Sequence, residues 1–214
     1  MKLIILAAPG AGKGTQAEKL SKHFGIPTIS TGAILRKNIA DGTELGEIAK
    51  KYIDEGKFVP DNVMIDIVGK RLSEDDCKNG FILDGFPRTT QQAEKLQTIL
   101  EADKNINLKI INLDVDKDIL YERSSNRYMC EDCSKTHSIK EGYVKGESKC
   151  DCGGNLIKRA DDTPEVLTQR LDAYEKQTKP IIDLYGDKVQ NVSVVGEDAP
   201  LQLVLSEVFD IIEY

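Results

Sequence analysis

The chain has 214 residues, of which 40% are hydrophobic, enough for one substantial core with inserts. No apolar run approaches membrane-spanning length and the N-terminus lacks a signal-peptide layout, so we expect a cytoplasmic protein with no membrane partner. The net charge of −7 weighs against a nucleic-acid partner, because phosphate-backbone binding usually needs a basic face.

Apolar, β-rich runs alternate with amphipathic runs along the chain. Strands are expected at residues 3–6, 27–30, 80–84, 108–113 and 189–195. Helices are expected at 14–24, 32–40, 45–54, 60–73, 90–102, 117–126, from the cap signature at Asp162 to about 184, and at 201–212. The alternation predicts an α/β fold with a doubly wound, five-stranded parallel sheet, and ligands beyond the carboxyl ends of its strands. Residues 30–60 and 128–159 break the alternation and are expected to be inserts.

The segment Ala7–Thr15 carries the strongest functional signal. It reads Ala-Ala-Pro-Gly-Ala-Gly-Lys-Gly-Thr, between an apolar run and a helix-like run. A strand that turns through glycines into a helix lets backbone N–H groups and the helix dipole bind phosphate. In such a loop Lys13 reaches the outer phosphates and Thr15 holds Mg²⁺. The usual pattern begins with glycine where this chain has Ala7, which strains the turn if the position needs a positive φ and is harmless in ordinary extended backbone.

Asp84 and a cysteine cluster are the next candidates. Asp84 ends the run Phe81–Asp84, where a carboxylate near a phosphate loop typically partners the phosphate-bound Mg²⁺. Four of the five cysteines form a CxxC pair and a CxC pair: Cys130, Cys133, Cys150 and Cys152. This pattern favours a structural, tetrahedral zinc site that stiffens its insert. A three-cysteine site completed by His137 or Asp151 is the alternative.

Arginine is rare in this chain, with seven arginines against 22 lysines. Because its planar guanidinium clamps phosphate as an ammonium cannot, each arginine is a candidate phosphate ligand. Thr31-Gly32, Arg36, the turn Gly85–Thr89 and the run Arg159–Asp162 resemble the bacterial adenylate kinases, and the cysteine-bearing insert resembles their zinc-containing form. The similarity runs nearly end to end. Six of the seven arginines then fall on nucleotide positions of the family, leaving only Arg71.

The resemblance implies a P-loop kinase with a core (1–29, 60–126 and 160–214), an AMP-binding insert (30–59) and a zinc-bearing lid (127–159). It implies that the following residues bind ATP: Gly10, Ala11, Gly12, Lys13, Gly14, Thr15, Arg123, Arg127, Thr136, His137 and Asp198. It implies that the following bind AMP: Thr31, Arg36, Lys57, Phe58, Val59, Gly85, Phe86, Pro87, Arg88, Gln92, Arg159 and Arg170. The implied catalytic residues are Lys13, Asp84, Arg88, Arg123, Arg159 and Arg170, with Asp161 and Asp162 stabilising the lid and hinge.

The implied activity is the reversible, Mg²⁺-dependent transfer of a phosphoryl group from ATP to AMP, giving two ADP, by a monomer. Another nucleoside-monophosphate kinase, with UMP, CMP or GMP as acceptor, is the alternative. A zinc-ribbon protein that binds nucleic acid is disfavoured by the acidic balance. Ala33 and Tyr128 stand where the family commonly has aspartate and arginine, so a nucleotide-binding regulator that lost catalysis through Ala7 and Ala33 is a further alternative; we expect activity to be retained.

Overall fold

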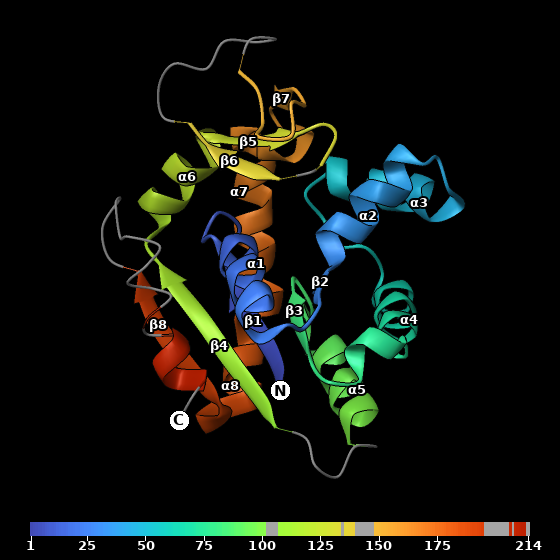
Figure 1. Ribbon diagram of the computed structural model, residues 1–214, viewed down its shortest axis with the longest axis vertical. Helices are drawn as coiled ribbons and strands as arrows, with labels where there is room; N and C mark the ends of the chain where they lie inside the picture. The colour runs from blue at the N-terminus through green and yellow to red at the C-terminus, as the bar shows by residue number, and fades with distance from the viewer. Residues whose placement is uncertain (102–106, 134, 140–147, 195–205, 207, 213–214) are drawn as a thin grey trace.

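A computed structural model describes residues 1–101, 107–133, 135–139, 148–194, 206 and 208–212 (Figure 1). Its centre is a parallel sheet with the strand order β2-β3-β1-β4-β8. The strands are β1 (Lys2–Ala7), β2 (Thr28–Ser30), β3 (Phe81–Asp84), β4 (Leu108–Val115) and β8 (Val189–Val194). The predicted five-stranded doubly wound sheet is therefore confirmed. Val195, at the end of the predicted last strand, lies outside the described residues.

Helices cover both faces of this sheet because alternate strand residues point to opposite sides. Leu3 and Ile5 of β1 pack in one apolar cluster with Leu20 of α1, whereas Ile4 and Leu6 pack in a second cluster that includes Leu96 of α5. The helices around the sheet are α1 (Lys13–Phe24), α4 (Asp61–Leu72), α5 (Thr90–Leu100), α6 (Lys117–Ser125), α7 (Pro164–Ala173) and α8 (Pro180–Tyr185). Residues 208–212 are also helical; residues 201–205 of the helix predicted there lie outside the described part of the chain.

Two further helices follow β2 and form the first insert. They are α2 (Thr31–Ala40) and α3 (Glu44–Asp54), which pack against each other. Thr43 caps α3, its Oγ1 accepting a hydrogen bond from the Gly46 amide at 3.1 Å. In Figure 1 this pair stands beyond the carboxyl end of β2, above α4. One-turn 3₁₀ segments lie at Asp75–Cys77, Ala160–Asp162 and Gly186–Lys188.

The second insert contains a small antiparallel sheet that sequence analysis did not predict. It comprises β5 (Arg127–Cys130), β6 (Thr136–Ser138) and β7 (Leu156–Ile157), in the order β6-β5-β7. Strands of two to four residues carry too little alternation to be seen in a sequence. Tyr128, Cys130, Cys150 and Leu156 form its buried cluster. Tyr128, which stands where the resembled family commonly has arginine, therefore packs inside this insert.

The long helix predicted from Asp162 to about residue 184 is interrupted. It begins at Pro164, with Thr163 as its cap, and widens into a π-helical segment at Tyr174–Thr178 before Pro180. Pro180 lacks an N–H and its ring clashes with a regular preceding turn, so the wider turn accommodates it. Asp162 is therefore not the helix cap, and its carboxylate is available for other contacts. No helix among the described residues has the length and apolar character to cross a membrane.

Candidate active site

The glycine loop connects β1 to α1 and has the geometry that phosphate binding requires. Gly10 and Gly12 both have φ near 90°, a region that favours glycine. A Cβ on Gly10 would lie 2.9 Å from the Leu120 carbonyl oxygen, so the loop fits closely against α6. Ala7 lies in regular strand, paired with Leu113, and not in a left-handed turn. Its methyl group therefore causes none of the strain that a positive φ would produce.

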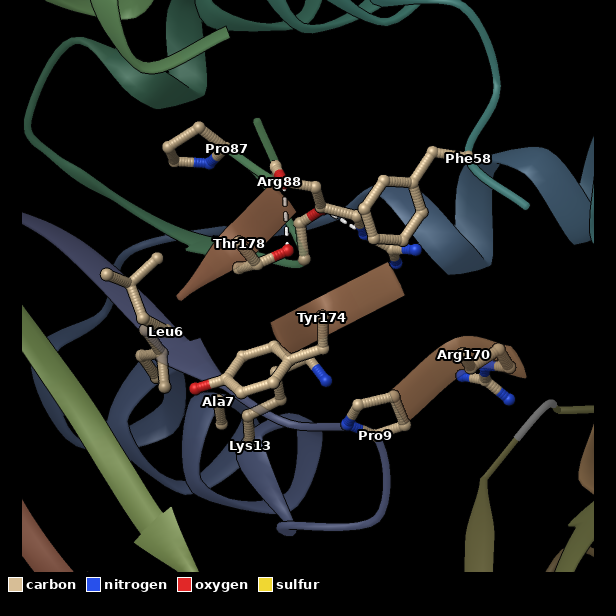
Figure 2. Close-up of a pocket in the computed structure, with 12 residues that line it drawn as sticks. Leu6, Ala7, Pro9, Lys13, Phe58, Pro87, Arg88, Arg170, Tyr174 and Thr178 are labelled. Atoms are coloured by element: carbon tan, nitrogen blue, oxygen red, sulfur yellow. Dashed lines mark hydrogen bonds between the residues drawn. The ribbon is translucent and has the colours of Figure 1, made fainter. Parts of the chain in front are cut away.

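Lys13 lies at the start of α1 and lines a pocket together with Arg88 and Arg170 (Figure 2). Desolvation lowers the pKa of Lys13 to about 8, with Asp84 opposing the shift and Arg88, Arg170 and Arg127 adding to it. Three elements far apart in sequence thus bring cationic groups to one cavity. A cavity of this charge is suited to a polyphosphate.

ATP binding is expected to drive proton uptake by Lys13 near pH 9. With a pKa of about 8 the free amine is mostly neutral there, and neighbouring phosphates raise its pKa, so the complex takes up close to one proton. Calorimetric titrations of ATP in buffers of different ionisation enthalpy measure this uptake. It should disappear in Lys13→Met and persist in Lys19→Met, an exposed position on the same helix; equal uptake in all three proteins would contradict it.

Asp84 closes β3 beside the glycine loop. Its Oδ2 accepts a hydrogen bond from Ser30 Oγ at 3.0 Å, and a Cβ on Gly14 would lie 3.5 Å from that oxygen. Its Oδ1 is buried and has no hydrogen-bond partner among the described residues. A buried carboxylate oxygen normally has a partner, and an unpaired one on a carboxylate beside a phosphate loop fits a Mg²⁺ ion or its bound water.

The turn after β3 forms the opposite wall of the pocket. Gly85 has φ 79°, and its carbonyl accepts hydrogen bonds from Thr31 Oγ1 and Arg88 Nε, both at 2.8 Å. Thr178 Oγ1 donates to the Arg88 carbonyl at 2.8 Å, which ties the turn to the π-helical segment (Figure 2). The Arg88 guanidinium lies 5.2 Å from the centre of the Phe58 ring. Burial lowers the pKa of Arg88, although Asp84 and Asp161 counteract it.

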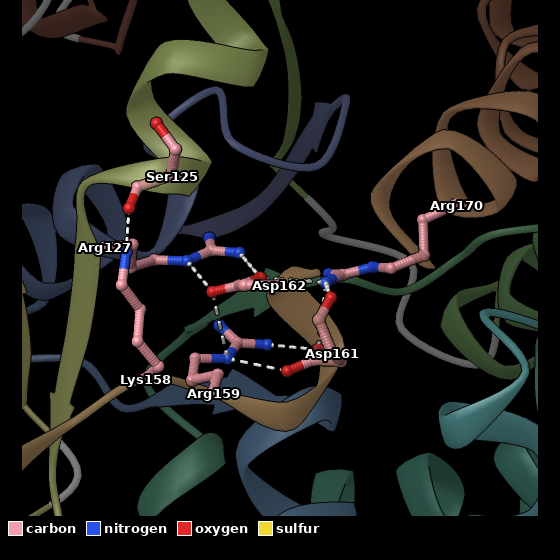
Figure 3. A network of polar contacts seen from close by, with 7 residues as sticks. All are labelled: Ser125, Arg127, Lys158, Arg159, Asp161, Asp162 and Arg170. Atoms are coloured by element: carbon pink, nitrogen blue, oxygen red, sulfur yellow. Dashed lines mark hydrogen bonds and ion pairs between the residues drawn. The ribbon is translucent and has the colours of Figure 1, made fainter. Parts of the chain in front are cut away.

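Arginines from the second insert and α7 gather around two carboxylates (Figure 3). Arg127 pairs with Asp162, Arg159 pairs with Asp161, and Arg170 Nη1 donates to Asp161 Oδ2 at 2.9 Å. Burial alone would raise the pKa of Asp161, but Arg170 and Arg159 lower it well below its usual value. The predicted structural role of Asp161 and Asp162 agrees with these contacts.

Arg36 is a further cation that interacts electrostatically with Arg159 and Asp161 of this network. Burial and the neighbouring Arg159 together lower its pKa to about 10, against the opposing effect of Asp161. Burial likewise lowers the pKa of Arg170 to about 10. Closely placed guanidinium groups of depressed pKa indicate a site organised to receive anionic charge.

The four clustered cysteines come together as the metal hypothesis requires. Their sulfur atoms all lie within 4.8 Å of one another, with 3.5 Å between Cys130 and Cys152 and 3.6 Å between Cys133 and Cys150. A tetrahedral zinc site with bonds of about 2.3 Å places its sulfurs about 3.8 Å apart. The Asp151 carboxylate pairs with Lys135 instead, which favours the four-cysteine set over the alternative with Asp151.

Several predicted site residues are not among those that line this pocket. Phe86 is in the apolar core, Lys57 is exposed and pairs with Glu55, and Thr136 is exposed on β6. The His137 Nε2 atom lies 3.2 Å from Cys150 Sγ, so its ring contacts the cysteine cluster. Arg123 is half-buried on α6. Val59, the residue after Phe58, is buried. Asp198 lies outside the described residues. The nucleotide contacts expected of these residues stay predictions.

Sequence reasoning missed four residues that support the site. Ser30 and Thr178 hold Asp84 and Arg88 as described above, and Tyr174 lines the pocket. Asp61 accepts a hydrogen bond from Gln92 Nε2 at 2.7 Å, although its sequence context indicated only a helix start. No local pattern distinguishes these side chains, because the partners of Ser30, Thr178 and Asp61 are distant in sequence and Tyr174 reaches the pocket only in the folded chain.

Comparisons with known proteins agree with this geometry. The adenylate kinase family model matches residues 5–190. An adenylate kinase of Caldicellulosiruptor saccharolyticus is 50% identical over 200 residues, covering 92% of this chain and 93% of its own. One of Methanosarcina mazei is 50% identical over 208 residues, covering 92% and 96%, and one of Clostridium perfringens is 47% identical over 212 residues, covering 98% and 95%. With matches of this extent over the phosphate loop, the arginine-lined pocket and the cysteine-bearing insert, the chain belongs to the adenylate kinase family.

Proposed function

We propose that this chain catalyses the reversible transfer of the γ-phosphoryl group of ATP to AMP, giving two ADP. The observation that carries the proposal is that Lys13, Arg88 and Arg170 line one pocket, which joins the glycine loop to the turn after β3 and to α7. A donor phosphate on the loop and an acceptor phosphate on the turn would then meet between these cations. Membership in a family of nucleoside-monophosphate kinases supports the same reaction.

The reaction needs alignment and charge more than proton transfer. A phosphate monoester is largely dianionic at pH 7, so an oxygen of AMP attacks the γ-phosphorus without a protein base. The bond from that phosphorus to the β–γ bridging oxygen breaks, and the β-phosphate of the new ADP keeps the electron pair. Lys13 and the arginines stabilise the charge on the transferred group, and exclusion of water prevents hydrolysis.

Mg²⁺ would be held with ATP by Thr15 at the start of α1 and by Asp84, whose Oδ1 lacks a protein partner among the described residues. The ion neutralises phosphate charge when it is bound. Residues 30–59 and 127–159 are proposed to close over the two nucleotides as an AMP-binding insert and a lid, while the remainder forms the core. The protein is proposed to act as a monomer.

Zinc is proposed to occupy the four-cysteine cluster and to stabilise the lid. Metal analysis should find about one zinc per chain, and chelation should lower the melting temperature by roughly 5 °C or more, since each kcal/mol changes it by about 2–4 °C at this size. Calorimetric melts with and without chelator measure the shift. The Cys133→Ser variant should show no further shift on chelation; an unchanged melting temperature in the native chain would contradict the role.

The proposal is tested by following ADP formation with ATP and Mg²⁺ fixed and the acceptor varied among AMP, GMP, UMP and CMP. AMP should give the highest kcat/KM. A preference for another monophosphate would instead identify a different nucleoside-monophosphate kinase. Nucleotide binding without ADP formation would identify a regulator that has lost catalysis.

A further inference from the structure

Gln92 lies at a junction between the turn after β3, α5 and the start of α4. It is 1% exposed, and its side-chain amide has two protein partners. Oε1 accepts a hydrogen bond from the Arg88 backbone amide at 2.8 Å, and Nε2 donates to Asp61 Oδ1 at 2.7 Å. The first partner, Arg88, lies in the turn that lines the pocket, and the second, Asp61, lies 31 positions from Gln92 in sequence.

These two partners allow only one orientation of the Gln92 amide. A backbone N–H can only donate a hydrogen bond, and an ionised carboxylate can only accept one. Turning the amide over would place Nε2 against the Arg88 N–H and Oε1 against the Asp61 carboxylate, leaving both contacts repulsive in a buried setting.

Thr89 fixes the Asp61 carboxylate in turn. Its Oγ1 donates to Asp61 Oδ2 at 2.8 Å and accepts a hydrogen bond from the Gln92 backbone amide at 3.1 Å. Asp61 therefore uses both carboxylate oxygens: Oδ1 accepts from the Gln92 side-chain amide and Oδ2 accepts from the Thr89 hydroxyl. This closed ring holds Gln92 from its backbone and from its side chain.

The fixed amide retains one Nε2 hydrogen and one Oε1 lone pair, which form a donor beside an acceptor. For a base held in one placement by its ribose and phosphate, the adenine edge (N1 acceptor, N6 donor) matches this order. The cytosine edge (N3 acceptor, N4 donor) has the same order. Guanine and uracil present the reverse order, with a ring N–H and a carbonyl oxygen.

We propose that Asp61 is a positioning residue that sets base specificity at the acceptor site by locking the orientation of the Gln92 amide. This inference rests on the proposed function, in that the acceptor monophosphate binds beside Gln92. The site selects bases with an adenine-type hydrogen-bonding edge and rejects guanine and uracil through mismatched polar contacts, which are a strong source of discrimination.

The test is the Asp61→Asn variant, because its amide can turn to meet either orientation of Gln92. The ratios of kcat/KM for AMP over GMP and for AMP over UMP should each fall by about tenfold, since one of two polarity constraints is lost. The AMP over CMP ratio should stay within about twofold, and so should the KM for ATP. A purely structural role of Asp61 would lower kcat/KM for all four acceptors by the same factor and leave every ratio unchanged.

Matched controls separate this effect from damage to α4. Asp66→Asn makes the same chemical change at an exposed position on that helix and should leave all ratios unchanged. Thr89→Val removes the hydrogen bond to Asp61 Oδ2 but leaves the Arg88 N–H and the Asp61 carboxylate as partners of the Gln92 amide, so it should also leave all ratios unchanged. Unchanged AMP over GMP ratios in folded Asp61→Asn protein would overturn the proposal, as would an equal fall in the AMP over CMP ratio.

Equilibrium binding distinguishes failure of this inference from failure of the proposed function. Calorimetric titration of AMP, GMP, UMP and CMP without ATP measures the same ratios with no turnover. If the native chain forms no ADP but the binding ratios shift as stated, the activity is wrong and the role of Asp61 stands. If ADP forms and the binding ratios do not shift, the role of Asp61 is wrong.

Discussion

Replacing Lys13 with methionine is expected to lower kcat by about 10²–10³-fold and to change the KM for AMP by less than about threefold. Lys13 lines the pocket with Arg88 and Arg170, and it is also the first residue of the helix that follows the glycine loop. It therefore lies between the loop proposed to hold the donor phosphates and the turn proposed to hold the acceptor. Its ammonium would thus contact the group being transferred. Methionine keeps most of the length and packing of the side chain and removes the charge together with the N–H donors of the ammonium.

Steady-state kinetics with saturating ATP and Mg²⁺ measure this effect. Lys19→Met changes the same residue type at an exposed position of α1 and should match the native chain. A Lys13→Met protein that retains more than about a tenth of the native kcat would show that the arginines suffice, and would remove Lys13 from the catalytic set.

Replacing Asp162 with alanine is expected to destabilise the chain by about 3–5 kcal/mol, as when one partner of a buried ion pair is removed. Its side chain is 1% exposed, pairs with Arg127 and lies 3.3 Å from Arg170 Nη1. Alanine would leave buried guanidinium groups uncompensated. Asn at this position keeps an acceptor oxygen, so the loss should be smaller.

Urea unfolding of the native chain, Asp162→Ala and Asp162→Asn measures these differences. Asp172→Ala, at an exposed position on α7, should change stability by less than about 0.5 kcal/mol. A saturating ATP–Mg²⁺ complex should recover part of the Asp162→Ala loss, because phosphates would then neutralise the same arginines. Equal stabilities of the Asp162→Ala and Asp172→Ala proteins would contradict the role given to this carboxylate.

The neighbouring Asp161 gives the network a defined pH dependence. Its folded pKa lies below the ordinary value of 3.8, so the unfolded chain binds more protons as the pH falls through that value. The stabilisation by Asp161 is therefore complete above about pH 5 and is lost progressively below about pH 4. Unfolding titrations from pH 6 to pH 3 should show a smaller loss in Asp161→Asn than in the native chain.

The sheet and the glycine loop could be predicted because their signals are local. Each strand of the sheet is a short apolar run between turn residues, and the glycine loop lies wholly within Ala7–Thr15. The scarcity of arginine made each one conspicuous. The four cysteines were visible as two close pairs.

The remainder depends on contacts between distant residues. The partnership of Asp61 with Gln92 forms only when α4 and α5 pack together, and Asp61 alone indicates no more than a helix start. The short strands β5, β6 and β7 pair residues from separate parts of the second insert, and their buried cluster of Tyr128, Cys130, Cys150 and Leu156 forms only when these parts meet. The π-helical segment before Pro180 widens a helix that periodicity alone describes as regular.

The most direct test of the central claim is to follow the label of γ-³²P-ATP in a reaction with unlabelled AMP and Mg²⁺. The account predicts two ADP formed for each AMP consumed, with label in the ADP made from AMP and none released as inorganic phosphate. Lys13→Met should give a rate at least about 10²-fold lower. Label released as inorganic phosphate, or ADP formation no faster than in Lys13→Met, would contradict phosphoryl transfer between ATP and AMP at this pocket.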